Sequence, residues 1–200
     1  MTDPWRRLCS GMRSTSQTDV PLSSGNAPPA AATRHQRMPW PRFILRAGLA
    51  LVLVLWTGAY LIERFHIGYD DQDHQCLPPY RWFLIDRHDR EVPQGGIVAF
   101  AALGLGPYFR DGQTLIKRAA GVPGDRVEVG LETVRINGAT VGEGLALARA
   151  FKRPPTDFLR DDVVPPGHLW MMGATADSFD SRYWGFLPER QVIGRAYALW

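Results

Sequence analysis

The segment V-R-I-N-G-A-T-V at residues 134–141 is typical of a β-hairpin. Its apolar and polar residues alternate on either side of Asn137-Gly138, a pair that readily adopts the positive φ angles of a two-residue turn. Short apolar runs separated by turn residues occur on both sides of this hairpin, and each run predicts a strand. The runs cover residues 81–85, 96–101, 114–120, 126–129, 168–172 and 191–199. We therefore predict a mainly β domain over residues 65–200, with a short helix at 145–151.

Composition predicts a folded body that follows a basic N-terminal region. The 200 residues are 45% apolar and 22% charged, which excludes disorder of the whole chain. Residues 1–46 carry seven Arg and two Asp, whereas residues 47–200 carry 16 basic and 18 acidic side chains. A basic tail on a near-neutral body argues against nucleic-acid binding and favours a membrane topology. Residues 1–40, rich in Ser, Pro and Ala, are expected to be a disordered cytoplasmic tail.

An uncharged run at residues 47–62, A-G-L-A-L-V-L-V-L-W-T-G-A-Y-L-I, predicts a transmembrane helix. With the apolar residues 43–45 it reaches about 20 residues, enough to cross the hydrocarbon core of a bilayer. We therefore expect an anchor over residues 41–64. Arginines precede the run, so the positive-inside rule places the N-terminus in the cytoplasm and residues 65–200 outside.

Two other interpretations of this run remain open. The first is a cleaved signal peptide, since Thr57-Gly58-Ala59 has the small-x-small pattern of a cleavage site and Met38 is an alternative start. The second is a buried core helix, although the run has no polar face. We favour the anchor because the 46 residues before the run are too many for the leading region of a secretory signal.

Few reactive side chains occur in the expected outer domain. They are one cysteine, Cys76, two lysines, Lys117 and Lys152, and two serines, Ser178 and Ser181. Lys117 shares one face of its predicted strand with Leu115 and Ala119. Desolvation on such a face favours the neutral amine, which can act as a base. The alternative is a lysine that extends its amine into water.

Two segments resemble the signal peptidase I enzymes, the S26 peptidases. K-R-A-A-G-V-P-G-D at residues 117–125 is similar to their lysine box, and M-G-A-T-A-D-S-F-D-S-R-Y-W-G at residues 172–185 is similar to their C-terminal box. The order of the boxes and the preceding apolar run extend the resemblance over about residues 43–200. C-L-P-P-Y-R-W-F-L-I-D and V-I-G-R-A indicate the TraF-like branch, which matures pilins in conjugative transfer systems. The resemblance implies a signal-peptidase-like, β-rich catalytic domain that is preceded by one transmembrane helix.

The resemblance also implies roles for five residues of the two boxes. Lys117 matches the general-base lysine of the family, and Ser178 matches the serine that orients this lysine. Asp180 and Arg182 match a pair that braces the site. Gly173 matches the glycine that opens the last box.

The chain departs from the family at the nucleophile, where Cys76 stands in place of serine. His74 lies two residues earlier, where many relatives place a hydroxyl that helps to form the oxyanion hole. An ordinary thiol loses its proton at lower pH than an ordinary ammonium, so Cys76 and Lys117 side by side are expected to form a thiolate–ammonium pair. Lys117 would then begin the reaction as an acid. A buried, inert thiol is the alternative.

These features predict a membrane-anchored endopeptidase at the outer face of a bacterial inner membrane, with a single-pass topology. The expected partners are a preprotein or pilin substrate, inner-membrane lipid and conjugative secretion machinery, with no nucleic acid. A catalytically inactive scaffold of a conjugation or secretion apparatus and a pilin peptidyl transferase or cyclase remain as alternatives. No cofactor or metal is expected, because no metal-ligand spacing connects the histidines His66, His74, His88 and His168.

Overall fold

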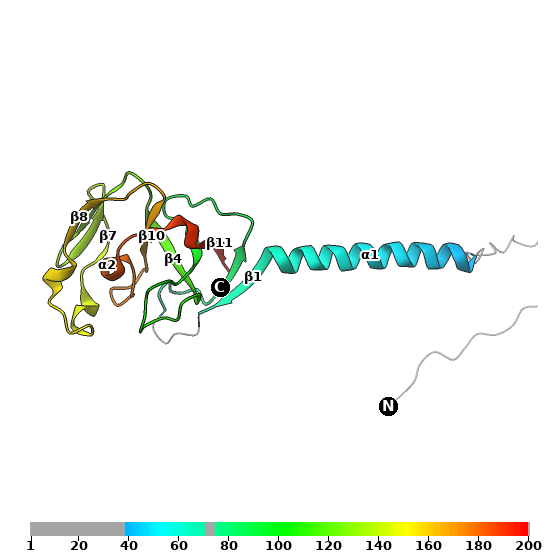
Figure 1. Ribbon diagram of the computed structural model, residues 1–200, viewed down its shortest axis with the longest axis horizontal. Coiled ribbons are helices and arrows are strands. Elements are labelled where there is room, and N and C mark those ends of the chain that lie inside the picture. The colour runs from blue at the N-terminus through cyan, green and yellow to red at the C-terminus, as the bar shows by residue number, and fades with distance from the viewer. Residues whose placement is uncertain (1–38, 71–74, 200) are drawn as a thin grey trace, which may run out of the picture. The chain divides into compact units, whose positions relative to one another are not determined.

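The structure, a computed structural model, describes residues 39–70 and 75–199 (Figure 1). Its first element is α1, Trp40–Arg64, close to the anchor predicted over residues 41–64. None of the α1 side chains is buried, so packing in a protein core does not account for the apolar surface of this helix. Within the described residues, α1 is long and apolar enough to cross a membrane, with a mean hydropathy of 1.8. Residues 1–38 of the predicted tail lie outside the described part of the chain.

The residues after α1 form a mainly β body, which confirms the predicted fold class. Seven strands form the first sheet in the order β1-β2-β11-β3-β4-β9-β10, and paired neighbours run antiparallel. The strands of this sheet are β1 Phe65–Tyr69, β2 Trp82–Asp86, β3 Ile97–Ala101, β4 Thr114–Gly121, β9 His168–Met172, β10 Leu187–Pro188 and β11 Val192–Ala198.

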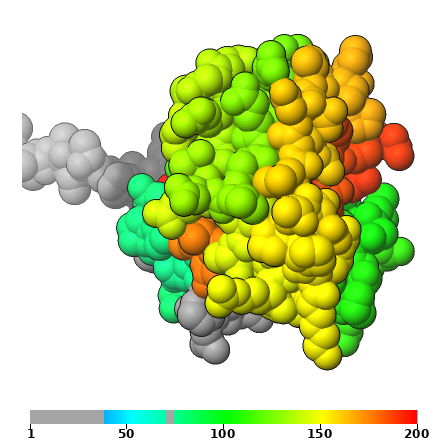
Figure 2. Space-filling model, turned by 90° about the vertical axis from the view of Figure 1, so that its left-hand side faces the viewer, coloured from blue at the N-terminus to red at the C-terminus, as the bar shows by residue number. Residues whose placement is uncertain are grey.

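A second sheet contains four strands in the order β7-β6-β5-β8. Its strands are β5 Arg126–Val129, β6 Thr133–Ile136, β7 Ala139–Glu143 and β8 Arg160–Val163. β6 and β7 form the predicted hairpin, and Asn137 and Gly138 at its turn have φ angles of 50° and 81°. β7 and β8 lie at the opposite end of the β body from β1 and β11 (Figure 1). Figure 2 looks onto that end, where the second sheet lies, coloured yellow-green to orange.

Short helical turns connect the strands. They are η1 Ala146–Arg149, η2 Pro155–Phe158, α2 Ser181–Trp184 and η3 Glu189–Gln191. The short helix predicted over residues 145–151 is wrong in extent and type, because η1 is a single 3-10 turn. Lys152 has a φ angle of 54° and two prolines follow Arg153, so the segment has no room for a second turn.

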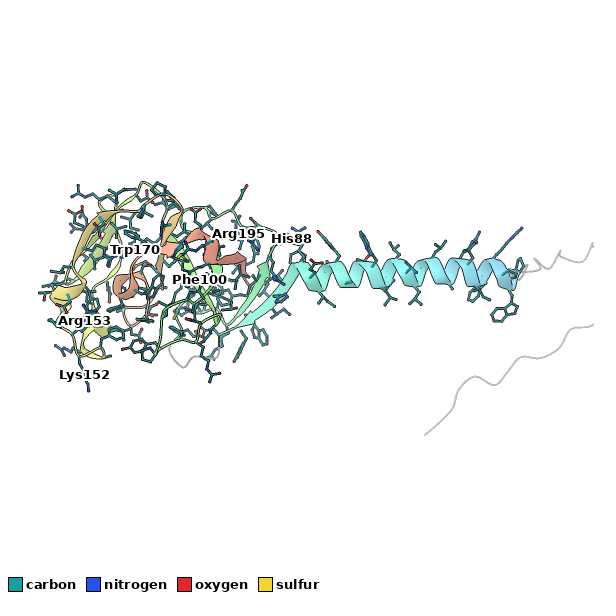
Figure 3. All side chains as sticks on the ribbon, viewed as in Figure 1. His88, Phe100, Lys152, Arg153, Trp170 and Arg195 are labelled. Carbon is teal, nitrogen blue, oxygen red and sulfur yellow. The ribbon has the colours of Figure 1, made fainter. Side chains whose placement is uncertain are left out.

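Buried side chains pack against both faces of β4. Leu115 and Ala119 of β4 pack in a buried cluster with Phe100, whereas Ala120 belongs to a second cluster around Trp170. Phe100 and Trp170 are completely buried (Figure 3). β9 contributes to both clusters in the same way, because its side chains alternate between the two faces of the sheet. This packing fixes the strand that carries Lys117.

Candidate active site

Lys117 lies in the middle of β4, paired in register with Val98 of β3. Its side chain is only 2% exposed, and Leu115 and Ala119 on the same face of the strand are buried. The amine Nζ donates hydrogen bonds to Cys76 Sγ at 2.8 Å and to Ser178 Oγ at 2.7 Å. The lysine amine is therefore held between a thiol and a hydroxyl and is shielded from water.

Cys76 precedes β2, in a segment that is tied to the end of β9. The carbonyl of Cys76 accepts a hydrogen bond from Ala174 N at 2.7 Å, and the next residue, Leu77, is buried in the core. The side chain of Cys76 is half-buried and forms no disulfide among the described residues. His74 lies outside the described residues, so its part in an oxyanion hole stays a prediction.

A buried ion pair braces the segment between β9 and α2. The side chains of Asp180 and Arg182 are 0% and 1% exposed, and Arg182 Nη2 lies 2.8 Å from Asp180 Oδ2. Burial disfavours the charge of the guanidinium, but the hydrogen bonds and charge of Asp180 outweigh burial and raise the pKa of Arg182. Asp180 also accepts the backbone N–H of Gly173 at 2.9 Å. Arg182 donates to five backbone carbonyls, those of Glu143, Gly144, Thr175, Ala176 and Ser178.

Gly173 permits the close approach of the groups around Lys117. A Cβ atom at this position would overlap the side chain of Ser178 and lie 3.0 Å from the carbonyl oxygen of Cys76. Only glycine leaves room for both contacts, which is a steric reason for this residue at the opening of the C-terminal box.

Cys76 and Lys117 are both among the residues that line a cleft of about 260 Å³. Its walls include apolar residues of β1, β2 and β4, namely Ile67, Phe83, Ile85, Leu115 and Ile116. Gly68 of β1 also lines it, and a Cβ atom there would lie 2.9 Å from Ile116 Cδ1. The absence of a side chain at Gly68 therefore keeps the cleft open between the edge strand β1 and β4.

Some residues around the site gave no signal in the sequence. Phe109 lines the cleft and stacks on Phe179, with ring centroids 5.7 Å apart. Phe179 lies between Ser178 and Asp180, so this stack joins the cleft wall to the segment that holds the lysine partner. The carbonyls of Glu143 and Gly144 were missed as well, because a backbone acceptor leaves no mark on residue type.

The groups beside the cleft are of the types that acyl transfer uses. A thiol, an amine and a hydroxyl lie within direct hydrogen-bond contact, with the amine of Lys117 between the other two. Among the described residues, no group of three or more His, Cys, Asp or Glu side chains could hold a metal ion.

The β-rich body with an adjacent sulfur, amine and hydroxyl is typical of a peptidase that uses a lysine. A family model described as signal peptidase, peptidase S26, matches residues 40–200, and the chain belongs to this family. The resemblance that the two sequence boxes predict is thereby confirmed.

Individual relatives include both signal peptidases and conjugation proteins. The chain is 28% identical to signal peptidase I of Leptolyngbya laminosa over 190 residues, 91% of this chain and 90% of that protein. It is 34% identical to the conjugal transfer protein TraF of Agrobacterium fabrum over 169 residues, 78% of this chain and 92% of that protein. A solved structure of signal peptidase I from Enterococcus faecalis is 30% identical with a TM-score of 0.35, covering 54% of this chain and 97% of that one.

Proposed function

We propose that this protein is a membrane-anchored endopeptidase in which Cys76 is the nucleophile and Lys117 transfers the protons. The observation that carries the proposal is the 2.8 Å contact between Cys76 Sγ and the buried Lys117 Nζ, at the wall of an open cleft. Removing a lysine amine from water costs free energy of folding. A cysteine that only packs in the core gains nothing from such a neighbour, whereas a reactive thiol does.

The first half of the reaction cleaves the peptide bond. The thiolate of Cys76 attacks the carbonyl carbon of the scissile bond, and the charge that develops on its oxygen is stabilised by backbone N–H groups, with Cys76 N as a candidate. The ammonium of Lys117 then gives a proton to the departing amine. The products of this step are a thioester on Cys76, a free amine fragment and a neutral Lys117.

The second half of the reaction releases the other fragment. The neutral Lys117 amine removes a proton from a water molecule, which attacks the thioester carbonyl. The thiolate of Cys76 leaves, and the Lys117 ammonium is restored beside it. Ser178 Oγ accepts a hydrogen bond from Nζ and so keeps the amine directed at the sulfur through both halves.

We further propose a preprotein substrate with small side chains before the cleaved bond. The cleft is small and bounded by branched and aromatic side chains, so that larger substrate side chains would clash with its walls. The similarity to a conjugal transfer protein favours a pilin precursor among such substrates. With α1 as the anchor and arginines on its N-terminal side, residues 65–200 would act at the periplasmic face of the inner membrane.

Co-expression with a pilin precursor that carries an Ala-x-Ala site tests the proposal, with products measured by mass spectrometry. The full-length protein should release the mature fragment, whereas Cys76→Ala and Lys117→Ala should leave the precursor intact. Cys76→Ser should keep measurable activity, because the hydroxyl occupies the same position. Cys9→Ser and Lys152→Ala are matched controls that change the same residue types elsewhere in the sequence.

The same experiment separates the alternatives. Full processing by Cys76→Ala or by Lys117→Ala would contradict the catalytic assignment. A precursor left intact by the wild-type protein would favour a scaffold role. A product lighter than the hydrolysed fragment by one water molecule would indicate cyclisation. A product with the mass of the fragment plus an acceptor peptide, less one water molecule, would indicate peptidyl transfer.

A further inference from the structure

The contact between Cys76 and Lys117 also brings together the two reactants of a reversible covalent modification. We propose that a hydroperoxide converts this pair into a sulfenamide, a covalent bond between Cys76 Sγ and Lys117 Nζ that closes the site. The proposal goes beyond peptide cleavage, because it depends on the sulfur–nitrogen contact and not on any substrate.

Oxidation of the sulfur comes first. Cys76 is half-buried and lines the open cleft, so a molecule as small as hydrogen peroxide can reach it. The thiolate attacks one peroxide oxygen, an S–O bond forms and the O–O bond breaks. The sulfur is oxidised by two electrons to sulfenic acid, and the other oxygen leaves as hydroxide.

Formation of the sulfenic acid removes the negative charge beside Lys117. The ammonium is then 2% exposed and faces the neutral sulfenic acid and the neutral hydroxyl of Ser178. A buried charge that loses its counter-charge is costly, so Nζ gives one proton to the hydroxide and becomes a neutral amine. The pair thereby produces its own nucleophile at the moment when the sulfur becomes an electrophile.

The amine then completes the bond. Its lone pair attacks Sγ, an S–N bond forms and the S–O bond breaks, and the oxygen leaves as water with a second proton from Nζ. In sum, one thiolate, one ammonium and one hydrogen peroxide give one sulfenamide and two water molecules. The nitrogen starts 2.8 Å from the sulfur and is held there by Ser178, so little movement is needed.

The sulfenamide protects the nucleophile from irreversible oxidation. A sulfenic acid with no nearby partner proceeds to sulfinic acid, which ordinary thiols do not reduce. Two molecules of a thiol reductant return the sulfenamide to the free thiol and amine, with one disulfide as the oxidised product. A sulfenic acid can condense with a second thiol to form a disulfide. Among the described residues no second cysteine lies near Cys76, and the amine of Lys117 is the group in contact with its sulfur.

The test is a mass measurement on the full-length protein in detergent micelles, in a Cys9→Ser background, before and after hydrogen peroxide. A proteolytic digest should contain the Cys76 and Lys117 peptides joined and lighter by two hydrogen atoms, and dithiothreitol should separate them. Lys117→Arg should abolish the link and give sulfinic acid at Cys76, since a guanidinium stays protonated. Lys152→Arg should leave the link intact, because Lys152 points away from the body (Figure 3).

Sulfinic acid at Cys76 without a link in the wild-type sequence would overturn the proposal, and so would a link that involves Lys152. The mass readout needs no substrate, so failures of the two proposals are distinguishable. A protein that cleaves the pilin precursor but forms no link refutes only the sulfenamide. A protein that forms the link but cleaves nothing refutes only the peptidase.

Discussion

Ser178 Oγ lies 2.7 Å from Lys117 Nζ and accepts one of the hydrogen bonds of this amine. Ser178 is itself buried, and its carbonyl oxygen accepts a hydrogen bond from Arg182 Nη2 at 3.1 Å. The lysine is therefore positioned through a chain of contacts that ends in the buried ion pair of Asp180 and Arg182. A substitution at each step of this chain of contacts is expected to cause a different measurable defect.

Ser178→Ala removes the hydroxyl that accepts a hydrogen bond from Lys117 and that we propose orients its amine. A hydrogen bond to a charged group is worth about 1.5–3 kcal/mol, so kcat should fall about tenfold to a hundredfold. KM should change little, because Ser178 is not among the residues that line the cleft. Steady-state kinetics with a peptide of the pilin cleavage site give both constants, and an unchanged kcat would exclude the orienting role.

Gly173→Ala places a methyl group where the Ser178 side chain lies. Ser178 must then move away from Lys117, so the loss of kcat should be about as large as that of Ser178→Ala. Ala174→Ser, at the exposed neighbouring residue, is the control and should retain activity. Equal activity of Gly173→Ala and the wild type would show that the site tolerates a displaced serine.

Asp180→Asn leaves the buried guanidinium of Arg182 without its counter-charge. Breaking a buried ion pair in this way lowers the free energy of unfolding by about 3–5 kcal/mol. The control is the exposed pair Arg126–Asp161, in which both side chains are 58% exposed, so that Asp161→Asn should cost about 0–1 kcal/mol. Chemical denaturation of the full-length protein in micelles measures the free energy of unfolding of both variants. Similar decreases for the two variants would contradict the conclusion that burial makes the Asp180–Arg182 pair important for stability.

Arg64 at the end of α1 binds Asp86 of β2, with Arg64 Nη2 2.6 Å from Asp86 Oδ2. The hydrogen bonds from Arg64 lower the pKa of Asp86 below its usual value of 3.8. A carboxylate with a lowered pKa stabilises the fold at neutral pH, and this contribution is lost as pH falls below about 4 towards the pKa in the folded state. The difference in Tm between the wild type and Asp86→Asn should therefore be larger at pH 7 than at about pH 3. A constant difference would contradict the pairing.

Local patterns predicted the strands whose sequence carries its own signal. The hairpin of β6 and β7 has alternating residues and an Asn-Gly turn, and β4 has an apolar run. β1 and β8 were missed for a physical reason. β1 is a largely exposed edge strand, and β8 reads R-D-D-V with charged residues, so both depend on long-range pairing with β2 and β5.

The site is predicted from sequence only through the resemblance of its boxes. Cys76 and Ser178 are 41 and 61 residues from Lys117, and neither periodicity nor turn chemistry shows that such distant residues meet. The five carbonyls around Arg182 and the stack of Phe109 on Phe179 depend on loop conformation, which residue types leave open.

The rate of iodoacetamide alkylation of Cys76 at pH 7 tests most directly whether Lys117 keeps the sulfur charged. In a Cys9→Ser background, where Cys76 is the only thiol, Lys117→Met should slow alkylation about tenfold or more, because the opposite charge beside the sulfur is removed. Lys152→Met should leave the rate unchanged, and Tm measurements confirm that the variants are folded. Equal rates with Lys117 and with Met at this position would contradict the thiolate–ammonium pair.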